Sequence, residues 1–449
     1  MQDQTHHHLT TPPKIPSTIA LWLQKRNQFW FSVIVGGSAF LLYSCVYAFR
    51  KAFAVATFDE IYYLGISYKV WLVTFQVAGY ALSKFIGIKI ISELQTHSRT
   101  KGILLMVAIA GLSWLAFALT PAPYNIIFLF TNGLPLGLIW GMIFNYLEGR
   151  RSTEALGAGL SVSFIFASGF SKTVGALLMK VWGVSELWMP FATSCVFIIP
   201  LLFFLWILNQ VPPPNAMDEA MRTKRKPMNK IERERFVHQF FPGIVLFVLT
   251  YMLLTAFRDF RDNFSAELWQ SLGYGNSPEI FTLTEIPVSL TVLSVMASLM
   301  LIKKNITALM VNHIIVFTGM LLIGTTTYLF EIHAISPPTW MILIGLGLYM
   351  GYVPFNSTFF DRLIATFRFT GTVGFIMYVA DSFGYLASVG VLFYKEFGNA
   401  NITWVRFFIK GGYITAIIGG FLIAGSMLYF FLKNKNTQSA TNPLTTAYA

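Results

Sequence analysis

The sequence predicts an all-α membrane protein whose twelve transmembrane helices form two six-helix halves. Three observations lead to this prediction: the composition, the length of the apolar stretches and a repeat between the two halves of the chain. Of the 449 residues, 55% are hydrophobic and only 12% are charged, whereas about 25% of a soluble chain is charged. The composition therefore indicates a polytopic membrane protein.

The apolar stretches number about twelve, and each is long enough to cross a bilayer, which takes about 20 residues in a helix. Only helices satisfy their own backbone polar groups along spans of this length. The first stretch is too long for a signal peptide and no small-residue cleavage site follows it, so we expect no cleaved leader. We place the spans near residues 29–57, 70–92, 102–120, 124–147, 156–180, 187–209, 241–262, 280–302, 306–329, 338–360, 370–394 and 404–432.

The charges in the loops predict the orientation of the chain. Loops after even-numbered spans are basic, with Arg99, Arg150, Arg222, Lys224, Lys303 and Arg362 among their residues. The opposite loops are richer in acids, although Lys395, Arg406 and Lys410 are exceptions. By the positive-inside rule both termini are cytoplasmic. The net charge of +12 thus reflects topology, and we expect a lipid bilayer and a small molecule as partners, no nucleic acid, and a monomer.

A break in the middle of the chain separates the two halves. The sixth span ends in Val211-Pro212-Pro213-Pro214, and a charged segment follows. Consecutive prolines end a helix, and we expect the charged part to form a short surface helix before Pro242. The predicted division is a cytoplasmic tail at 1–28, a half at 29–210, a cytoplasmic linker at 211–240, a second half at 241–432 and a cytoplasmic tail at 433–449.

The two halves carry the same markers in the same order. Ala48-Phe49-Arg50 recurs as Ala256-Phe257-Arg258, which is 208 residues later. Two glycines four residues apart in span four recur in span ten, and a Val-Gly-containing run before Lys180 recurs before Lys395. Ordered markers in corresponding spans predict parallel repeats related by an axis along the membrane normal.

Charged side chains inside spans are expensive and therefore mark candidate functional sites. The predicted substrate-binding residues are Arg50, Lys84, Lys172, Arg258, Tyr47 and Tyr80. Guanidinium groups suit bidentate binding of carboxylate or phosphate; the alternative for Arg258 is an internal salt bridge with Asp259 or Glu285. Asp381 and Glu285 are predicted coupling or counter-ion residues. For Asp381 we favour a counter-ion over a proton carrier or a binder of a cationic substrate group.

The sequence indicates neither a metal site nor a cofactor. Cys45 and Cys195 lie inside apolar segments and are interpreted as small apolar residues. The histidine run at 6–8 lies in a polar tail. No Gly-x-Ser-x-Gly, His-Glu-x-x-His or nucleotide-binding loop occurs. We therefore do not expect an enzyme.

Spans one and two resemble a known family. Tyr47, Arg50, Lys51 and Phe53, followed by Tyr80, Ser83, Lys84, Phe85 and Ile86, are similar to the organophosphate:phosphate antiporters of the major facilitator superfamily. The resemblance implies the major facilitator fold and a phosphate site formed by Arg50, Lys84 and Arg258. The family's histidine in span five has no counterpart here, and Lys172 is one helical turn further on. The runs at 133–137 and 148–151 resemble a group of uncharacterised bacterial membrane proteins.

Together these features predict a secondary active transporter of the bacterial inner membrane that works by alternating access. The expected substrate is a small organic anion, phosphorylated or carboxylated. The alternative is a membrane sensor on a transporter scaffold, which binds a metabolite without transporting it.

Overall fold

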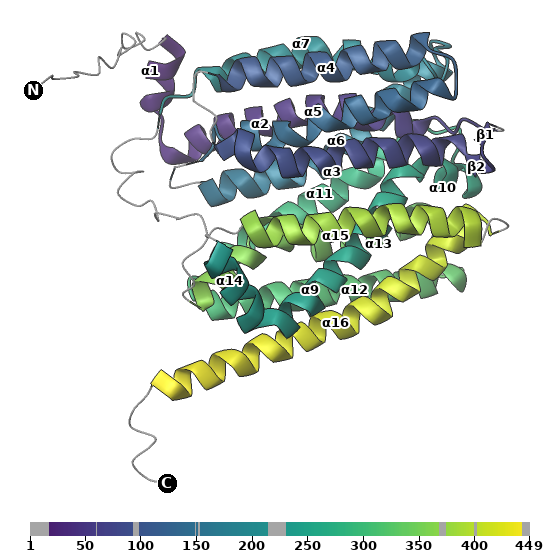
Figure 1. The fold of residues 1–449 in the computed structure, drawn as a ribbon. Helices are drawn as coiled ribbons and strands as arrows, with labels where there is room; N and C mark the ends of the chain where they lie inside the picture. Colours follow the sequence, from purple (N-terminus) through teal and green to yellow (C-terminus); the bar gives the residue numbers. More distant parts are fainter. Residues whose placement is uncertain are drawn as a thin grey trace, which may run out of the picture.

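The computed structural model describes residues 18–59, 61–92, 98–148, 150, 153–213, 230–367, 374–398 and 402–441, and most of them are helical (Figure 1). The long helices of the N-terminal half are α2 (Gln28–Lys51), α3 (Tyr68–Ser92), α4 (Arg99–Leu119), α5 (Ile127–Phe144), α6 (Thr153–Lys180) and α7 (Met189–Asn209). Those of the C-terminal half are α9 (Lys230–Asn263), α11 (Ile280–Leu299), α12 (Asn305–Glu331), α13 (Pro337–Ser357), α15 (Gly374–Phe393) and α16 (Trp404–Thr441).

Short elements lie at the helix ends. They are α1 (Thr18–Gln24), α10 (Ser265–Ser271), α14 (Phe359–Thr366), the 3-10 turns Ala52–Val55 and Tyr124–Ile126, the π turn Tyr394–Gly398, and a hairpin of β1 (Tyr62–Tyr63) and β2 (Ile66–Ser67). The two strands are antiparallel, and Tyr62 pairs with Ser67.

Local sequence signals start two of the long helices. The Asn27 side chain accepts a hydrogen bond of 2.9 Å from the Trp30 amide and so caps α2. The Ser336 hydroxyl caps α13, and Pro337 follows at the first helical position, where its missing N–H costs nothing.

The predicted fold class is confirmed. Each of the twelve predicted spans contains one long helix, and ten of the described helices are long and apolar enough to cross a membrane. The charged segment before Pro242 is helical as predicted, but it is continuous with α9 through a kink at Phe240. Proline lacks an N–H and its ring clashes with the preceding turn, which accounts for this kink. The basic residues of the linker at 214–229 lie outside the described residues.

Two boundaries differ from the predicted spans. Span ten ends at Ser357, and α14 follows as a separate helix. The last helix continues to Thr441, beyond the predicted end at 432. Past Ser357 the chain stays partly apolar although the helix is interrupted, whereas residues 433–441 are mostly polar although the helix continues, so hydrophobicity alone does not mark the end of either helix.

The helices of each half pack in the same pattern. In the N-terminal half α2 packs against α6 and α7, and α5 packs between α3 and α4. In the C-terminal half α9 packs against α15 and α16, and α13 packs between α11 and α12. The halves meet through α6 against α11 and through α3 against α15. The packing thus repeats as the sequence markers predict.

The bundle has two distinct ends. The helix α1 and the last residues of α16 lie at one end, which we call the terminal end, whereas β1, β2 and α10 lie at the other, the hairpin end (Figure 1). Because α2 starts at the terminal end and successive spans alternate in direction, Arg50 and Arg258 both lie near the hairpin ends of their helices.

Candidate functional site

A cavity of about 630 Å³ lies between the two halves. Side chains from α2, α3, α5 and α6 of one half and from α9, α13 and α15 of the other line it. It extends to Phe144, Asn145 and Glu148 at the terminal end of α5. Five of the six predicted substrate-binding residues line this cavity: Arg50, Lys84, Arg258, Tyr47 and Tyr80.

Arg50 enters the cavity from α2. Its guanidinium carbon lies 3.7 Å from the centre of the Tyr80 ring and 5.7 Å from that of Tyr47. Its Nε is buried and has no hydrogen-bond partner. Within the described part of the chain, no carboxylate forms an ion pair with Arg50. A desolvated guanidinium held on aromatic faces is a strong candidate to bind an anion.

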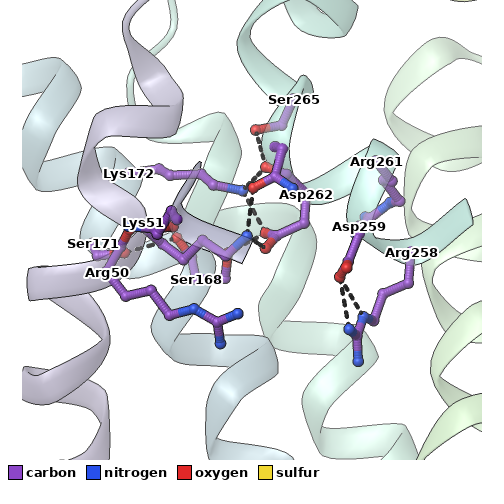
Figure 2. A network of polar contacts seen from close by, with 12 residues as sticks. Arg50, Lys51, Ser168, Ser171, Lys172, Arg258, Asp259, Arg261, Asp262 and Ser265 are labelled. Carbon is purple, nitrogen blue, oxygen red and sulfur yellow. Dashed lines mark hydrogen bonds and ion pairs between the residues drawn. The ribbon is translucent and has the colours of Figure 1, made fainter. Parts of the chain in front are cut away.

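Arg258 enters the same cavity from α9 of the other half. Its Nη2 and Nε both donate to Asp259 Oδ1, over 2.6 and 3.1 Å. Its guanidinium carbon lies 3.9 Å from the centre of the Tyr352 ring. The internal salt bridge considered for Arg258 is therefore formed with Asp259. Arg258 still faces the cavity, and Figure 2 shows its guanidinium opposite that of Arg50.

The hairpin side of the cavity is closed by an ion cluster, which we define as Lys51, Ser168, Lys172, Asp262 and Asn263 (Figure 2). Lys51 Nζ and Lys172 Nζ each lie 2.6 Å from one oxygen of the Asp262 carboxylate. Lys51 also donates to Asn263 Oδ1 over 2.5 Å, and the Ser168 hydroxyl donates to Asp262 Oδ1. Since α2 and α6 belong to one half and α9 to the other, the cluster joins the halves.

Lys172 is thus placed differently from the other predicted substrate residues. Its Nζ donates to the Asp262 carboxylate and to the Asp262 main-chain oxygen, both over 2.6 Å, and it does not line the cavity. Substrate contact by Lys172 stays a prediction. The geometry instead shows Lys172 holding α6 to α9.

Further ion pairs surround the cluster at the hairpin end. Arg261 Nη1 lies 2.7 Å from Glu285 Oε1, and Arg261 Nη2 donates to the Met341 carbonyl. Lys69 of the N-terminal half lies 2.6 Å from Glu267 on α10. Burial raises the pKa of Glu267 above its ordinary value, and the charge of Lys69 opposes that shift. The Arg261–Glu285 pair gives Glu285, which the sequence predicts as a coupling or counter-ion residue, an arginine partner within the protein.

Asp381 lies in the cavity wall on α15 and accepts a hydrogen bond of 2.5 Å from the Tyr251 hydroxyl. The Tyr251 and Tyr352 hydroxyl oxygens are 3.0 Å apart. Among the residues that the structure describes, no lysine or arginine forms an ion pair with Asp381. The counter-ion role of Asp381 therefore stays a prediction.

Sequence reasoning missed several of the residues around the cavity. Asp262 follows Arg258 at a spacing of four residues, in a run that alternates charges at the end of an apolar span, and this run was the available signal. Tyr349 and Tyr352 line the cavity from α13, where a tyrosine in an apolar helix carries no comparable signal.

Comparison with solved structures shows where this architecture occurs. The fold matches a D-xylose-proton symporter (TM-score 0.59, 15% identity, 89% of this chain and 96% of that chain). It also matches the nucleoside transporter NupG (TM-score 0.58, 12% identity, 88% and 98%). A third match is a bacterial homologue of the human drug peptide transporters PepT1 and PepT2 (TM-score 0.60, 12% identity, 90% and 99%). Because the sequence identities are this low, the comparison establishes the fold alone, which is the major facilitator fold.

Comparison by sequence gives a family without an assigned activity. A search of curated proteins found no match. One family model, described as a family of unknown function (DUF5690), matches residues 52–433, which is most of the chain. The chain therefore belongs to the DUF5690 family.

Proposed function

We propose that the protein is a secondary active transporter that moves a small organic anion by alternating access. The observation that carries this proposal is the placement of Arg50: a half-buried arginine in an inter-half cavity, whose Nε is buried without a hydrogen-bond partner, whose guanidinium stacks on Tyr80, and which has no carboxylate partner in the described chain. A buried charge is costly unless it is compensated. An anionic substrate would compensate it at the place where transporters of this architecture bind their substrates.

The arrangement of contacts supports one state of the alternating-access cycle. The ion cluster and the α6–α11 contact join the halves at the hairpin end, whereas the cavity extends to the terminal end of α5. With both termini in the cytoplasm, the cavity would face the cytoplasm. The solved structures with this fold include transporters named for a sugar, nucleosides and peptides, which supports transport and leaves the substrate class to the side chains of this site.

The side chains favour a phosphorylated or carboxylated metabolite. Arg50 and Arg258 approach one cavity from equivalent helices, and Lys84 Nζ lies 5.2 Å from the centre of the Tyr80 ring. This set agrees with the resemblance to the organophosphate:phosphate antiporters, in which these three positions form the phosphate site. We propose a bacterial inner membrane as the location and exchange against a second anion as the mode.

Reporter fusions test the orientation on which the cytoplasmic cavity depends. A reporter fused after Arg222 is expected to be active only in the cytoplasm, and one fused after Asn276 only on the outer side, because the loop charges follow the positive-inside rule. The measurement is the ratio of a cytoplasm-active to a periplasm-active reporter at each site. Both fusions on the same side would contradict the proposed orientation.

The substitution Arg50→Lys tests the anion site. Lysine keeps the charge but cannot form two parallel hydrogen bonds with an anion, so substrate affinity should fall by about 10- to 100-fold. The measurement is a screen of purified protein against phosphorylated and carboxylated metabolites by thermal stabilisation, followed by flux in proteoliposomes. Lys303→Ala, in the exposed loop after α11, is the control and should leave affinity unchanged.

Equal effects of the two substitutions would mean that Arg50 has a packing role only. Binding without measurable flux in proteoliposomes would instead identify a membrane sensor.

A further inference from the structure

Asp381 is a carboxylate with capacity left for a ligand. It lines the cavity and is 8% exposed. Its Oδ1 accepts the Tyr251 hydroxyl, and within the described residues Oδ2 accepts no hydrogen bond and no cation pairs with the group. A desolvated carboxylate left in this condition is unfavourable, and a donor or a cation brought by the substrate would relieve it.

Arg50 presents the opposite charge to the same cavity. Its guanidinium stacks on Tyr80, whose ring centre is 5.6 Å from that of Tyr385. Tyr385 is one helical turn after Asp381 on α15. The Tyr80–Tyr385 contact therefore connects the aromatic ring under the cation with the helix that carries the carboxylate. Two uncompensated charges of opposite sign thus face one cavity from opposite halves of the protein.

Other charges close to Arg50 and Asp381 already have partners. Arg258 is paired with Asp259, and Lys51 and Lys172 share Asp262. Tyr251 fixes the position of Asp381 because it donates to one carboxylate oxygen and stacks on Tyr352 at 5.2 Å between ring centres. The carboxylate is thereby held toward the cavity by protein groups that do not neutralise it.

We propose that Arg50 and Asp381 bind the two ends of one zwitterionic substrate, an organic anion that also carries an ammonium group. The phosphate or carboxylate binds Arg50, and the ammonium donates to Asp381. This inference rests on the proposed anion site and narrows its substrate class. It also gives Asp381 a counter-ion role toward the substrate instead of toward a protein cation.

The test compares ligands that differ only by an ammonium in place of a hydroxyl. The probes are glucosamine 6-phosphate against glucose 6-phosphate, and serine against glycerate, with Kd measured on purified full-length protein. In at least one pair the aminated member should bind about 10- to 100-fold more tightly, as expected for charged hydrogen bonds. Asp381→Asn should bring the ratio of the two Kd values close to one. Arg50→Lys should weaken both members and keep the ratio.

Two further variants keep the test decisive if Asp381→Asn does not fold. Asp381→Glu retains the charge and should retain the amine preference. Tyr251→Phe removes the hydroxyl that holds the carboxylate and should reduce the preference without abolishing anion binding. Equal affinity for both members of each pair would overturn the inference, and so would failure of all four probes to bind.

These results separate the inference from the proposed function. Anion binding and flux that persist with no amine preference leave the transporter proposal intact and remove the zwitterion. If anion binding and flux persist without an amine preference, and the Asp381→Asn variant exchanges substrate but cannot accumulate it, Asp381 is a proton carrier.

Discussion

Replacing Asp262 with asparagine is expected to destabilise the folded protein by about 3–5 kcal/mol, because it leaves two buried lysines without a counter-charge. Lys51 and Lys172 both bind this carboxylate over 2.6 Å, and each lysine side chain is only 4% exposed. Asparagine can accept a hydrogen bond but carries no charge. The measurement is the melting temperature of the detergent-solubilised protein, together with its yield in a monodisperse form.

A matched control and a rescue identify the cause of this loss. Glu279→Gln removes an exposed carboxylate at the same end of the bundle, and it should change the free energy of unfolding by at most about 0.5 kcal/mol. Replacing Lys51 and Lys172 with methionine in the Asp262→Asn background should restore much of the lost stability, because no buried charge is then unpaired. A melting temperature unchanged by Asp262→Asn would show that the cluster does not hold the halves together.

In each half, a residue that points into the cavity is close in sequence to a residue of the ion cluster. Arg50 faces the cavity and Lys51 binds the cluster, while Arg258 faces the cavity and Asp262 binds the cluster. The same short segments of α2 and α9 therefore carry both the proposed substrate site and the contact between the halves that would have to break for the hairpin end to open in the proposed cycle. Movement of either helix on binding an anion would act directly on this contact.

The sequence contains enough information to predict the fold class and most of the cavity. Apolar length alone predicts the twelve spans, since a bilayer imposes both a minimum length and helical structure. Arg50 and Arg258 are visible because an arginine in an apolar segment is costly, and its recurrence in the second half makes chance an unlikely cause. Their meeting across one cavity follows from the repeat.

The remaining features depend on which helix face meets which neighbour. Lys172 has the same sequence signature as Lys84, yet Lys84 lines the cavity and Lys172 binds Asp262. Apolar helices in a bilayer have residues of similar hydrophobicity on the lipid face and the packed face, so periodicity does not separate the two. The importance of Asp262 likewise arises only when α2, α6 and α9 are brought together.

A close contact between helices also closes the hairpin end. Gly169 on α6 packs against α11 of the other half so tightly that an added Cβ would lie 2.2 Å from the Phe281 carbonyl oxygen and 2.9 Å from Glu285 Cγ. Beyond it, Thr173 donates to the Pro278 carbonyl over 2.9 Å. Main chain cannot yield as a flexible side chain can, so any residue larger than glycine at position 169 should push α6 and α11 apart.

We therefore expect Gly169→Ala to shift the protein away from the state that is closed at the hairpin end, and to slow transport accordingly. Overpacking costs about 1–3 kcal/mol, which would lower the population of that state by about 5- to 150-fold. Each half stays internally packed, so the protein should remain folded. The control is Gly159→Ala on the same helix, where an added Cβ meets nothing within 4 Å.

Two measurements separate a shifted equilibrium from simple damage. In a background with Cys45 and Cys195 replaced by serine, a cysteine at position 173 should be labelled from the hairpin side faster in Gly169→Ala than in Gly159→Ala. Substrate flux should fall in the same variant while the melting temperature of each protein stays similar. Because α6 against α11 is a main contact between the halves, unchanged labelling with unchanged flux would mean that the hairpin end does not open and close during transport at this contact.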